Sequence, residues 1–274
     1  MSANDAIGRS VSVGGIETNY HDDGKGAPVL LLHGSAPGVS AWANWRKTTP
    51  VLREQYRTLS YDIPGFGYTA RSEDYHLGMK FWVQHAIGFL DAMKLEKVHI
   101  VGNSFGGALG LAVAIFAPER VEKLVLMGSG GLSRPVSDGL KAVWQYQPSV
   151  ENMRGLLERF VYDNEILTDE LVEARFEASQ LPLSDLPFQA LRRGAVEENG
   201  VLMTAGVPEE TVTQVKHDTL ILHGREDEIM PCDIGIALNE MLHNSDLHIF
   251  GKCGHWVQIE QHEKFHALVL DFLK

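Results

Sequence analysis

Short apolar runs rich in leucine, isoleucine and valine recur along the chain, and each ends at a glycine or a turn. Their lack of polar alternation is typical of strands buried on both faces of a parallel sheet. Helical patterns lie between them, and strands that alternate with helices indicate an α/β fold. We expect strands at residues 29–32, 58–61, 98–101, 124–127, 219–222 and 247–250, and helices at residues 81–94, 104–117 and 262–273.

Two parts of the chain depart from this alternation. Residues 10–20, broken by Gly14 and Gly15, predict an antiparallel hairpin at the start of the sheet. Further on, helical patterns succeed one another without an intervening strand. We therefore expect an α/β core over residues 1–131 and 208–274, and an inserted helical lid over residues 132–207.

The lid segment carries recognisable helix boundaries. Ser149 is placed to cap a helix whose apolar stripe runs over residues 153–161. The next helix is expected to begin at Thr168, because acidic residues come after it where the helix dipole favours them. Pro182 and Pro187 are expected to end that helix and to interrupt the residues beyond it.

Composition and charge exclude several classes of protein. Apolar residues make up 44% and charged residues 22% of the 274 residues, as in an ordinary globular chain rather than a disordered or fibrous one. The 24 basic and 36 acidic side chains leave a net charge of −12, so neither nucleic acid nor an anionic membrane is an expected partner. No apolar run reaches the roughly 18 residues of a membrane span. The N-terminus lacks a secretion signal, so a cytoplasmic protein is expected.

The cysteines give no sign of a metal site. The chain has two, Cys232 and Cys253, and in a reducing compartment they are expected to be free thiols. No pair of cysteines or of cysteine and histidine has the spacing of a zinc site. We therefore expect no bound metal.

The sharpest local signal is the sequence Gly-Asn-Ser-Phe-Gly at residues 102–106, directly after an expected strand and at the start of an apolar helix. Glycines on both sides let the chain turn sharply, which exposes Ser104 at the helix N-terminus, where partial positive charge favours an oxyanion. A serine that merely caps the helix is the alternative. This context favours Ser104 as a nucleophile.

A nucleophilic serine needs a histidine base and an acid that orients it, in the chain order serine, acid, histidine. His255 comes after the last expected strand, and Glu226, Asp227 and Glu228 come after the strand before it. Both positions lie where parallel sheets place their sites. The pattern alone leaves the three acids as competitors.

Backbone N–H groups are expected to receive the oxyanion. One belongs to Phe105, the residue after the nucleophile. The other is assigned to Ser35, because the strand at residues 29–32 runs into a glycine-bearing loop that permits close backbone approach. A tight turn without a catalytic role is the alternative for this loop.

Arg175 stands out by helical geometry. At 100° per residue it falls in the middle of the apolar face of its helix, whereas Glu170, Glu173 and Glu177 fall on the other side. A guanidinium in that position requires an anion. The anion could be a carboxylate of the protein or the carboxylate of a substrate, which arginine holds with two parallel hydrogen bonds.

Several motifs together resemble one family. They are His33-Gly34-Ser35-Ala36-Pro37-Gly38 with Trp42-Ala43-Asn44-Trp45, the strand-to-helix turn at residues 102–107 (called the elbow), Gly224-Arg225-Glu226-Asp227 and Cys253-Gly254-His255-Trp256. In combination they resemble the meta-cleavage product hydrolases of the α/β-hydrolase fold, bacterial enzymes that cleave a C–C bond of 2-hydroxy-6-oxohexa-2,4-dienoates. The resemblance covers essentially the whole chain. It implies a mostly parallel eight-stranded sheet flanked by helices.

The resemblance also implies roles for individual residues. Ser104, Asp227 and His255 become the catalytic triad, which selects Asp227 among the competing acids. Arg175 and Asn44 are expected near the carboxylate and 2-oxygen of the dienoate, with Trp256 beside them. Ala36 and Asn103 complete the implied substrate site. The family usually has glycine where this chain has Ala36, so a positive φ there would strain the loop.

The resemblance further implies an anionic dienoate as the substrate, no cofactor, and a homo-oligomer of two or more chains. Apolar residues form a candidate pocket for the 6-substituent, with ordinary core packing as the alternative: Leu140, Val143, Trp144, Phe160, Ile229 and Met230. A carboxylesterase with the same triad is the nearest alternative function. A ligand-binding receptor on a hydrolase scaffold is a more remote one.

Overall fold

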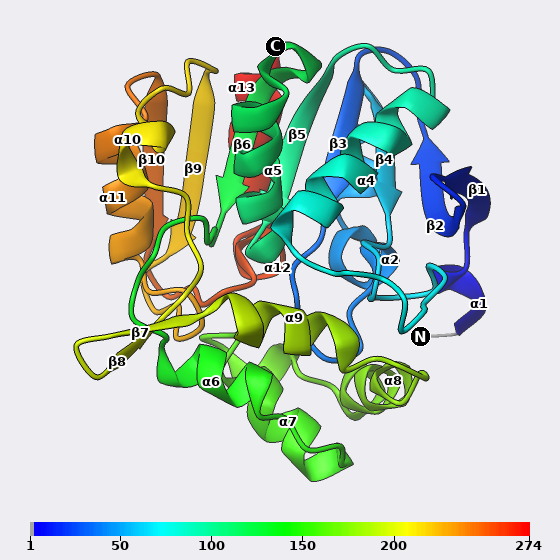
Figure 1. Cartoon of the computed structure of the whole chain (residues 1–274), viewed down its shortest axis with the longest axis vertical. Helices are drawn as coiled ribbons and strands as arrows, with labels where there is room; N and C mark the ends of the chain where they lie inside the picture. Colours follow the sequence, from blue (N-terminus) through cyan, green and yellow to red (C-terminus); the bar gives the residue numbers. More distant parts are fainter. Residues whose placement is uncertain (1–2) are drawn as a thin grey trace.

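The computed structural model describes residues 3–274 and contains an eight-stranded sheet with helices on both faces (Figure 1). The strand order is β1-β2-β4-β3-β5-β6-β9-β10. β2 runs antiparallel to both of its neighbours, and the other neighbouring pairs are parallel, which confirms the predicted class. The strands are β1 (Arg9–Val13), β2 (Ile16–Asp23), β3 (Pro28–Leu32), β4 (Arg57–Tyr61), β5 (Val98–Asn103), β6 (Val121–Met127), β9 (Thr219–Gly224) and β10 (Ser245–Phe250).

The central strands β3, β5, β6 and β9 are buried along almost their whole length, as their continuous apolar runs predict. The predicted burial was wrong for β10. This strand lies at the edge of the sheet, where only β9 pairs with it, and His248 and Ile249 are exposed. An apolar run at an edge is therefore shielded on fewer sides than the same run at the centre.

The predicted hairpin joins β1 to β2. Gly14 and Gly15 form its turn with φ angles of 59° and 87°. Positive φ at both positions of a two-residue turn matches the right-handed twist of the strands. Glycine adopts these angles without steric cost, which explains the pair of glycines.

Two helical layers cover the sheet (Figure 1). The larger apolar cluster packs α4, α5 and α11 against one face, and the smaller one packs α13 against the other face. The helices outside residues 132–207 are α1 (Ala3–Ala6), α2 (Ala41–Trp45), α3 (Thr49–Leu52), α4 (Met79–Ala92), α5 (Phe105–Phe116), α10 (Glu209–Val212), α11 (Asp233–Met241), α12 (Val257–Glu260) and α13 (His262–Leu273), with a 3₁₀ turn at Pro118–Arg120. Within residues 3–274 no helix combines the length and apolar character that a membrane crossing needs.

Residues 132–207, the inserted segment, separate β6 from β9 and lie across the carboxyl ends of the parallel strands (Figure 1). They contain α6 (Asp138–Trp144), α7 (Val150–Glu158), a 3₁₀ turn at Asn164–Ile166, α8 (Asp169–Ser179), α9 (Leu186–Gly194), β7 (Val196–Glu198) and β8 (Val201–Met203). The expected helix starts are confirmed, because Ser149 accepts a hydrogen bond from Asn152 N and Thr168 accepts one from Leu171 N.

Three details of the inserted segment differ from expectation. α7 ends at Glu158, so Phe160 lies in a turn beyond the helix. Pro187 lies in the first turn of α9 rather than breaking a helix, because its missing N–H is not needed there. Helices do not fill the segment, since Asn199 and Gly200 take φ angles of 51° and 78° and form the turn of the β7–β8 hairpin.

Candidate active site

Ser104 occupies a strained turn between β5 and α5. Its φ and ψ angles are 55° and −117°, a conformation that L-residues rarely adopt, and its side chain is 8% exposed. A Cβ on Gly106 would lie 2.2 Å from Leu32 O, and one on Gly102 would lie 2.4 Å from Gly106 O. Only glycine fits at these two positions, so the flanking glycines are what allow the turn.

Asp227 and His255 form a buried pair on the loops after β9 and β10. Nδ1 of His255 donates a hydrogen bond of 2.7 Å to Asp227 Oδ2, while Asp227 Oδ1 accepts bonds of 2.9 Å from the N–H groups of Ile229 and Met230. Burial raises the pKa of Asp227, but the neighbouring histidines outweigh it and lower this pKa to about 2. The carboxylate is therefore charged, satisfied and able to orient the imidazole.

The loop after β6 brings this pair close to Ser104. Ser104 N donates a hydrogen bond of 2.8 Å to Met127 O. A Cβ on the next residue, Gly128, would lie 3.1 Å from His255 Nδ1 and 3.2 Å from Asp227 Oδ2. Within residues 3–274 no hydrogen bond joins the Ser104 hydroxyl to His255, a contact that in ligand-free enzymes commonly tightens when substrate binds.

The loop after β3 lies against the nucleophile. A Cβ on Gly34 would be 3.2 Å from Ser104 Cβ, and Gly34 N donates a bond of 3.3 Å to Asn44 Oδ1. The N–H groups of Ser35 and Phe105 find no acceptor among the described residues, so both are free to receive an oxyanion. The φ angle of Ala36 is not positive, so its side chain does not strain the loop.

Arg175 is a buried cation without an anion. It lies on α8, is 5% exposed, and forms no ion pair within the described part of the chain. Its guanidinium carbon sits 5.9 Å from the centre of the Trp256 ring, and its Nε has no hydrogen-bond partner. Burial, and to a smaller extent the charge of Arg46, lowers the pKa of Arg175 to about 10, so it remains a cation at neutral pH. Of the two partners left open by the sequence, an internal carboxylate does not pair with Arg175 within residues 3–274.

Comparisons with known proteins identify the family and the fold. The family model for the α/β-hydrolase fold matches residues 27–261. A 2-hydroxy-6-oxo-2,4-heptadienoate hydrolase of Pseudomonas putida is 49% identical over 99% of this chain and 98% of its own. A solved serine-to-alanine variant of a meta-cleavage product hydrolase of Pseudomonas fluorescens, complexed with acetates, is 45% identical over 98% of both chains, with a TM-score of 0.91.

This chain belongs to the meta-cleavage product hydrolases. A more distant relative of solved structure is the 2-hydroxy-6-oxo-6-phenylhexa-2,4-dienoate hydrolase of a Rhodococcus species, 31% identical over 97% of this chain and 98% of its own, with a TM-score of 0.88. The predicted resemblance and fold are thereby confirmed.

In this meta-cleavage product hydrolase, the residues expected around the substrate carboxylate do come together. Asn44, Arg175 and Trp256 line one small cavity. Asn44 Nδ2 is buried without a hydrogen-bond partner, as Arg175 Nε is. Asn103 does not line this cavity; it donates a bond of 3.3 Å to Met127 O, which helps to hold the elbow.

The residues expected around the 6-substituent fall into two groups. Phe160 is beside the catalytic pair, because its carbonyl accepts a bond of 2.7 Å from His255 N and its ring centre lies 5.4 Å from the imidazole. Ile229 and Met230 also adjoin it, through their bonds to Asp227. The others are on α6, where Val143 and Trp144 line a separate hollow of about 520 Å³. Leu140 is buried in the apolar cluster shared by both groups.

Sequence reasoning missed three polar residues of the hydrolase site. His33 is fully buried, donates from Nδ1 to Gly34 O at 2.7 Å and accepts from Ile63 N at 2.9 Å, so it fixes the Ser35 loop. His223 donates a bond of 2.7 Å to Met230 O and lies 3.5 Å from Asp227 Oδ2. Gln258 is 1% exposed and lines the Arg175 cavity. The available signals were the position of His33 directly after β3, of His223 near the end of β9, and of Gln258 close to the His255-Trp256 motif.

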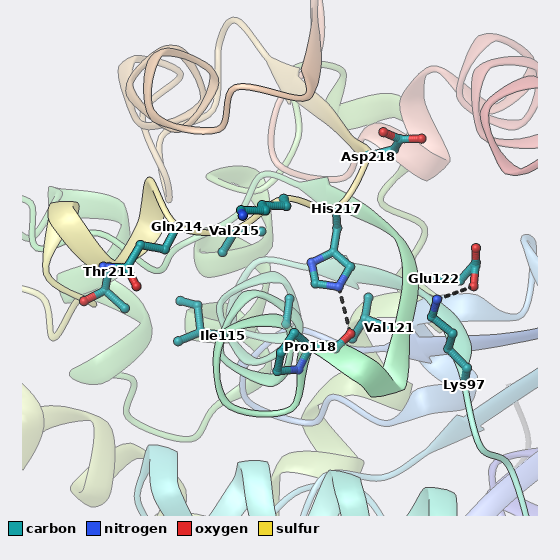
Figure 2. Close-up of a pocket in the computed structure, with 12 residues that line it drawn as sticks. Lys97, Ile115, Pro118, Val121, Glu122, Thr211, Gln214, Val215, His217 and Asp218 are labelled. Atoms are coloured by element: carbon teal, nitrogen blue, oxygen red, sulfur yellow. Dashed lines mark hydrogen bonds and ion pairs between the residues drawn. The ribbon is translucent and has the colours of Figure 1, made fainter.

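A large surface hollow of about 570 Å³ lies elsewhere. Figure 2 shows the residues that line it, near the starts of β6 and β9. Ser104 follows the end of β5, so the hollow is at the opposite end of the parallel strands from Ser104. Among its polar side chains, Lys97 pairs with Glu122 at 2.7 Å, and His217 contacts the Pro118 carbonyl at 2.9 Å. It contains none of the residues assigned to the reaction.

Proposed function

We propose that this protein hydrolyses a C–C bond of 2-hydroxy-6-oxohexa-2,4-dienoates, giving 2-hydroxypenta-2,4-dienoate and a carboxylic acid. The observation that carries this choice over a plain esterase is the buried, unpaired guanidinium of Arg175. An isolated buried charge is costly unless a counter-ion arrives. An ester substrate without a charge would not supply one, whereas the dienoate carboxylate would.

The reaction begins at the carboxylate end of the substrate. A ketone resists hydrolysis because its carbanion is a poor leaving group. Arg175 and Asn44 hold the carboxylate and the 2-oxygen while the dienol becomes the 2-oxo tautomer. The leaving carbon is then conjugated to that new carbonyl, which can accept the electron pair.

Cleavage occurs at the other end. The Ser104 hydroxyl attacks the 6-ketone as His255 takes its proton, and Asp227 stabilises the imidazolium. The N–H groups of Ser35 and Phe105 receive the oxyanion. As it collapses, the C–C bond breaks, the electron pair moves toward the 2-oxo end, and the proton returns from His255 to the departing dienoate. Water then hydrolyses the acyl-Ser104 with His255 as base.

Three assignments complete the proposal. The inserted segment, residues 132–207, acts as a lid because it supplies Arg175 and Phe160 to the site. The protein acts in the cytoplasm, a compartment compatible with the free thiols of Cys232 and Cys253. It assembles as a homo-oligomer, which light scattering of the purified protein would test.

The test is the absorbance decay of 6-methyl and 6-phenyl 2-hydroxy-6-oxohexa-2,4-dienoates with purified protein, beside p-nitrophenyl acetate and butyrate. Rapid bleaching of a dienoate that Ser104→Ala abolishes, with slower ester cleavage, supports the proposal. The methyl-to-phenyl ratio measures the pocket for the 6-substituent. Fast ester cleavage without bleaching contradicts it in favour of the esterase, and absence of any turnover favours a receptor.

A further inference from the structure

The small cavity beside Arg175 is lined by a graded series of cations. It has a volume of about 60 Å³ and lies between α2, α8 and α12. Lys47 is exposed, Arg46 is half-buried and Arg175 is buried, and all of them line this cavity. We call these residues the cation cluster. Positive charge therefore continues from the surface to the buried guanidinium.

The cation cluster is not neutralised from within. Over residues 3–274, neither Lys47 nor Arg46 forms an ion pair, and the same holds for Arg175. The hollow on the other side of Arg46 does include Asp22 and Asp23. Each is already engaged by another arginine, at 2.8 Å in both cases: Asp22 by Arg57 and Asp23 by Arg53.

The cavity also holds polar atoms that lack partners. Arg175 Nε, Asn44 Nδ2 and Gln258 Oε1 are buried without a hydrogen bond. Gln258 is itself anchored, because its Nε2 donates a bond of 3.4 Å to Asn44 O. Buried polar atoms are nearly always satisfied in folded proteins. Two donors and an acceptor left open beside unpaired cations indicate a place for a small anionic or polar group.

We propose that Lys47 and Arg46 act with Arg175 as an electrostatic guide, which draws the carboxylate of the substrate into the site and favours anionic over neutral substrates. This inference rests on the proposed function. The chain has a net charge of −12, so its overall field opposes the approach of an anion. Local unpaired cations reverse that field where the carboxylate must arrive. Lys47 and Arg46 are positioning residues here, because neither takes part in the chemical step.

The test compares Arg46→Gln with Arg193→Gln. Both changes remove one positive charge, and Arg193 is an exposed residue in the last turn of α9 that forms no ion pair within residues 3–274 and does not line the cavity. In Arg46→Gln at low ionic strength, the ratio of kcat/KM for the dienoate to that for p-nitrophenyl acetate should fall roughly threefold, mainly through KM. This fall in the ratio should disappear at roughly 1 M salt, because salt screens exposed charges. Arg46→Lys should restore the ratio, and adding Lys47→Gln should deepen the loss.

Other outcomes overturn the inference. A ratio equal to that of Arg193→Gln, or a loss that persists at high salt, means that Arg46 has no electrostatic role. If the wild-type protein fails to bleach any dienoate, the proposed function fails separately. The cluster is then tested with pyruvate, a small 2-oxo carboxylate, as an inhibitor of ester hydrolysis. A higher inhibition constant in Arg46→Gln supports the cluster, and an unchanged constant overturns it.

Discussion

Asp227 and Arg175 are two buried charged residues near the nucleophile, and they differ in how far the protein supplies partners for their charges. Asp227 accepts hydrogen bonds from two backbone N–H groups and from His255. Arg175 is buried to a similar degree, yet its Nε is unpartnered and no carboxylate of residues 3–274 pairs with it. The carboxylate of Asp227 therefore already has its hydrogen-bond partners in the ligand-free protein, whereas the guanidinium of Arg175 has no counter-ion among residues 3–274.

In the proposed mechanism this difference separates a group that takes part in the chemical step, Asp227, from a group that binds the substrate, Arg175. A base and its orienting acid must be arranged before substrate arrives, because rearranging them during the reaction would raise the barrier. A binding group can instead be left unsatisfied, so that the substrate carboxylate relieves its desolvation. Substitutions at both kinds of group, and in the loops beside them, test that contrast.

Replacing Asp227 should affect every substrate. Asp227→Asn leaves the shape of the site but favours the wrong tautomer of His255, so kcat should fall about 10⁴-fold. Because the loss lies in the triad, dienoates and p-nitrophenyl esters should suffer alike in steady-state assays. Glu228→Gln is the matched control, since Glu228 is the next residue and its exposed carboxylate pairs with Arg159 on the surface. Equal losses in both variants would contradict the choice of Asp227.

Acid should weaken the loop that carries Ser35. Burial, opposed by the bond to Gly34 and reinforced by Arg175, lowers the pKa of His33 to about 4. At pH values between about 6.5, the ordinary pKa of histidine, and about 4, His33 binds a proton in the unfolded chain but not in the folded one. The free energy of unfolding should therefore fall as pH falls, by about 3 kcal/mol from this group. Urea titrations of His33→Gln should show a shallower decline over that range, and an identical decline would contradict the assignment.

Removing the unpaired charge should stabilise the free protein. Arg175→Met keeps much of the length of the side chain but eliminates a desolvated cation, so the free energy of unfolding should rise by about 1 kcal/mol or more. Asp227→Asn should lower it, because its hydrogen-bonding partners remain buried. Parallel denaturant titrations measure both changes. A destabilised Arg175→Met protein would mean that Arg175 is held by a structural interaction.

The smallest effect is expected at Ala36. Since this residue does not have a positive φ, glycine relieves no strain there. Ala36→Gly should lower the free energy of unfolding by about 1 kcal/mol or less, through a more flexible unfolded chain and lost packing. Thermal denaturation measures it. A more stable variant would show that the alanine strains the loop.

Much of the fold could be predicted because its signals are local. Apolar runs marked the central strands, and Ser149 and Thr168 marked helix starts by their own capping bonds. The exposure of β10 could not be predicted, because it arises from the place of this strand at the edge of the sheet, and the sequence pattern does not give the order of the strands. The β7–β8 hairpin had a local signal in Asn199-Gly200, but the surrounding helical pattern obscured it.

The site divides in the same way. Ser104 and His255 were predicted from motifs that combine a residue type with a strand end. Arg175 was found from helical periodicity, but its lack of a partner could only be seen in three dimensions. Gln258 and Arg46 carried no motif, since the roles proposed for them rest on the cavity that they share with Arg175. Chemistry that resides in one loop is readable from sequence, whereas a cavity assembled from α2, α8 and α12 is not.

The most direct test of the carboxylate anchor is the substrate preference of Arg175→Met. We expect kcat/KM for a 2-hydroxy-6-oxohexa-2,4-dienoate to fall roughly 100-fold, because the substrate carboxylate loses its buried partner. Hydrolysis of p-nitrophenyl acetate, which has no carboxylate, should change by less than roughly threefold. A selective loss of dienoate turnover would establish Arg175 as the carboxylate anchor of a C–C hydrolase. Equal losses on both substrates, or no loss on either, would contradict that role.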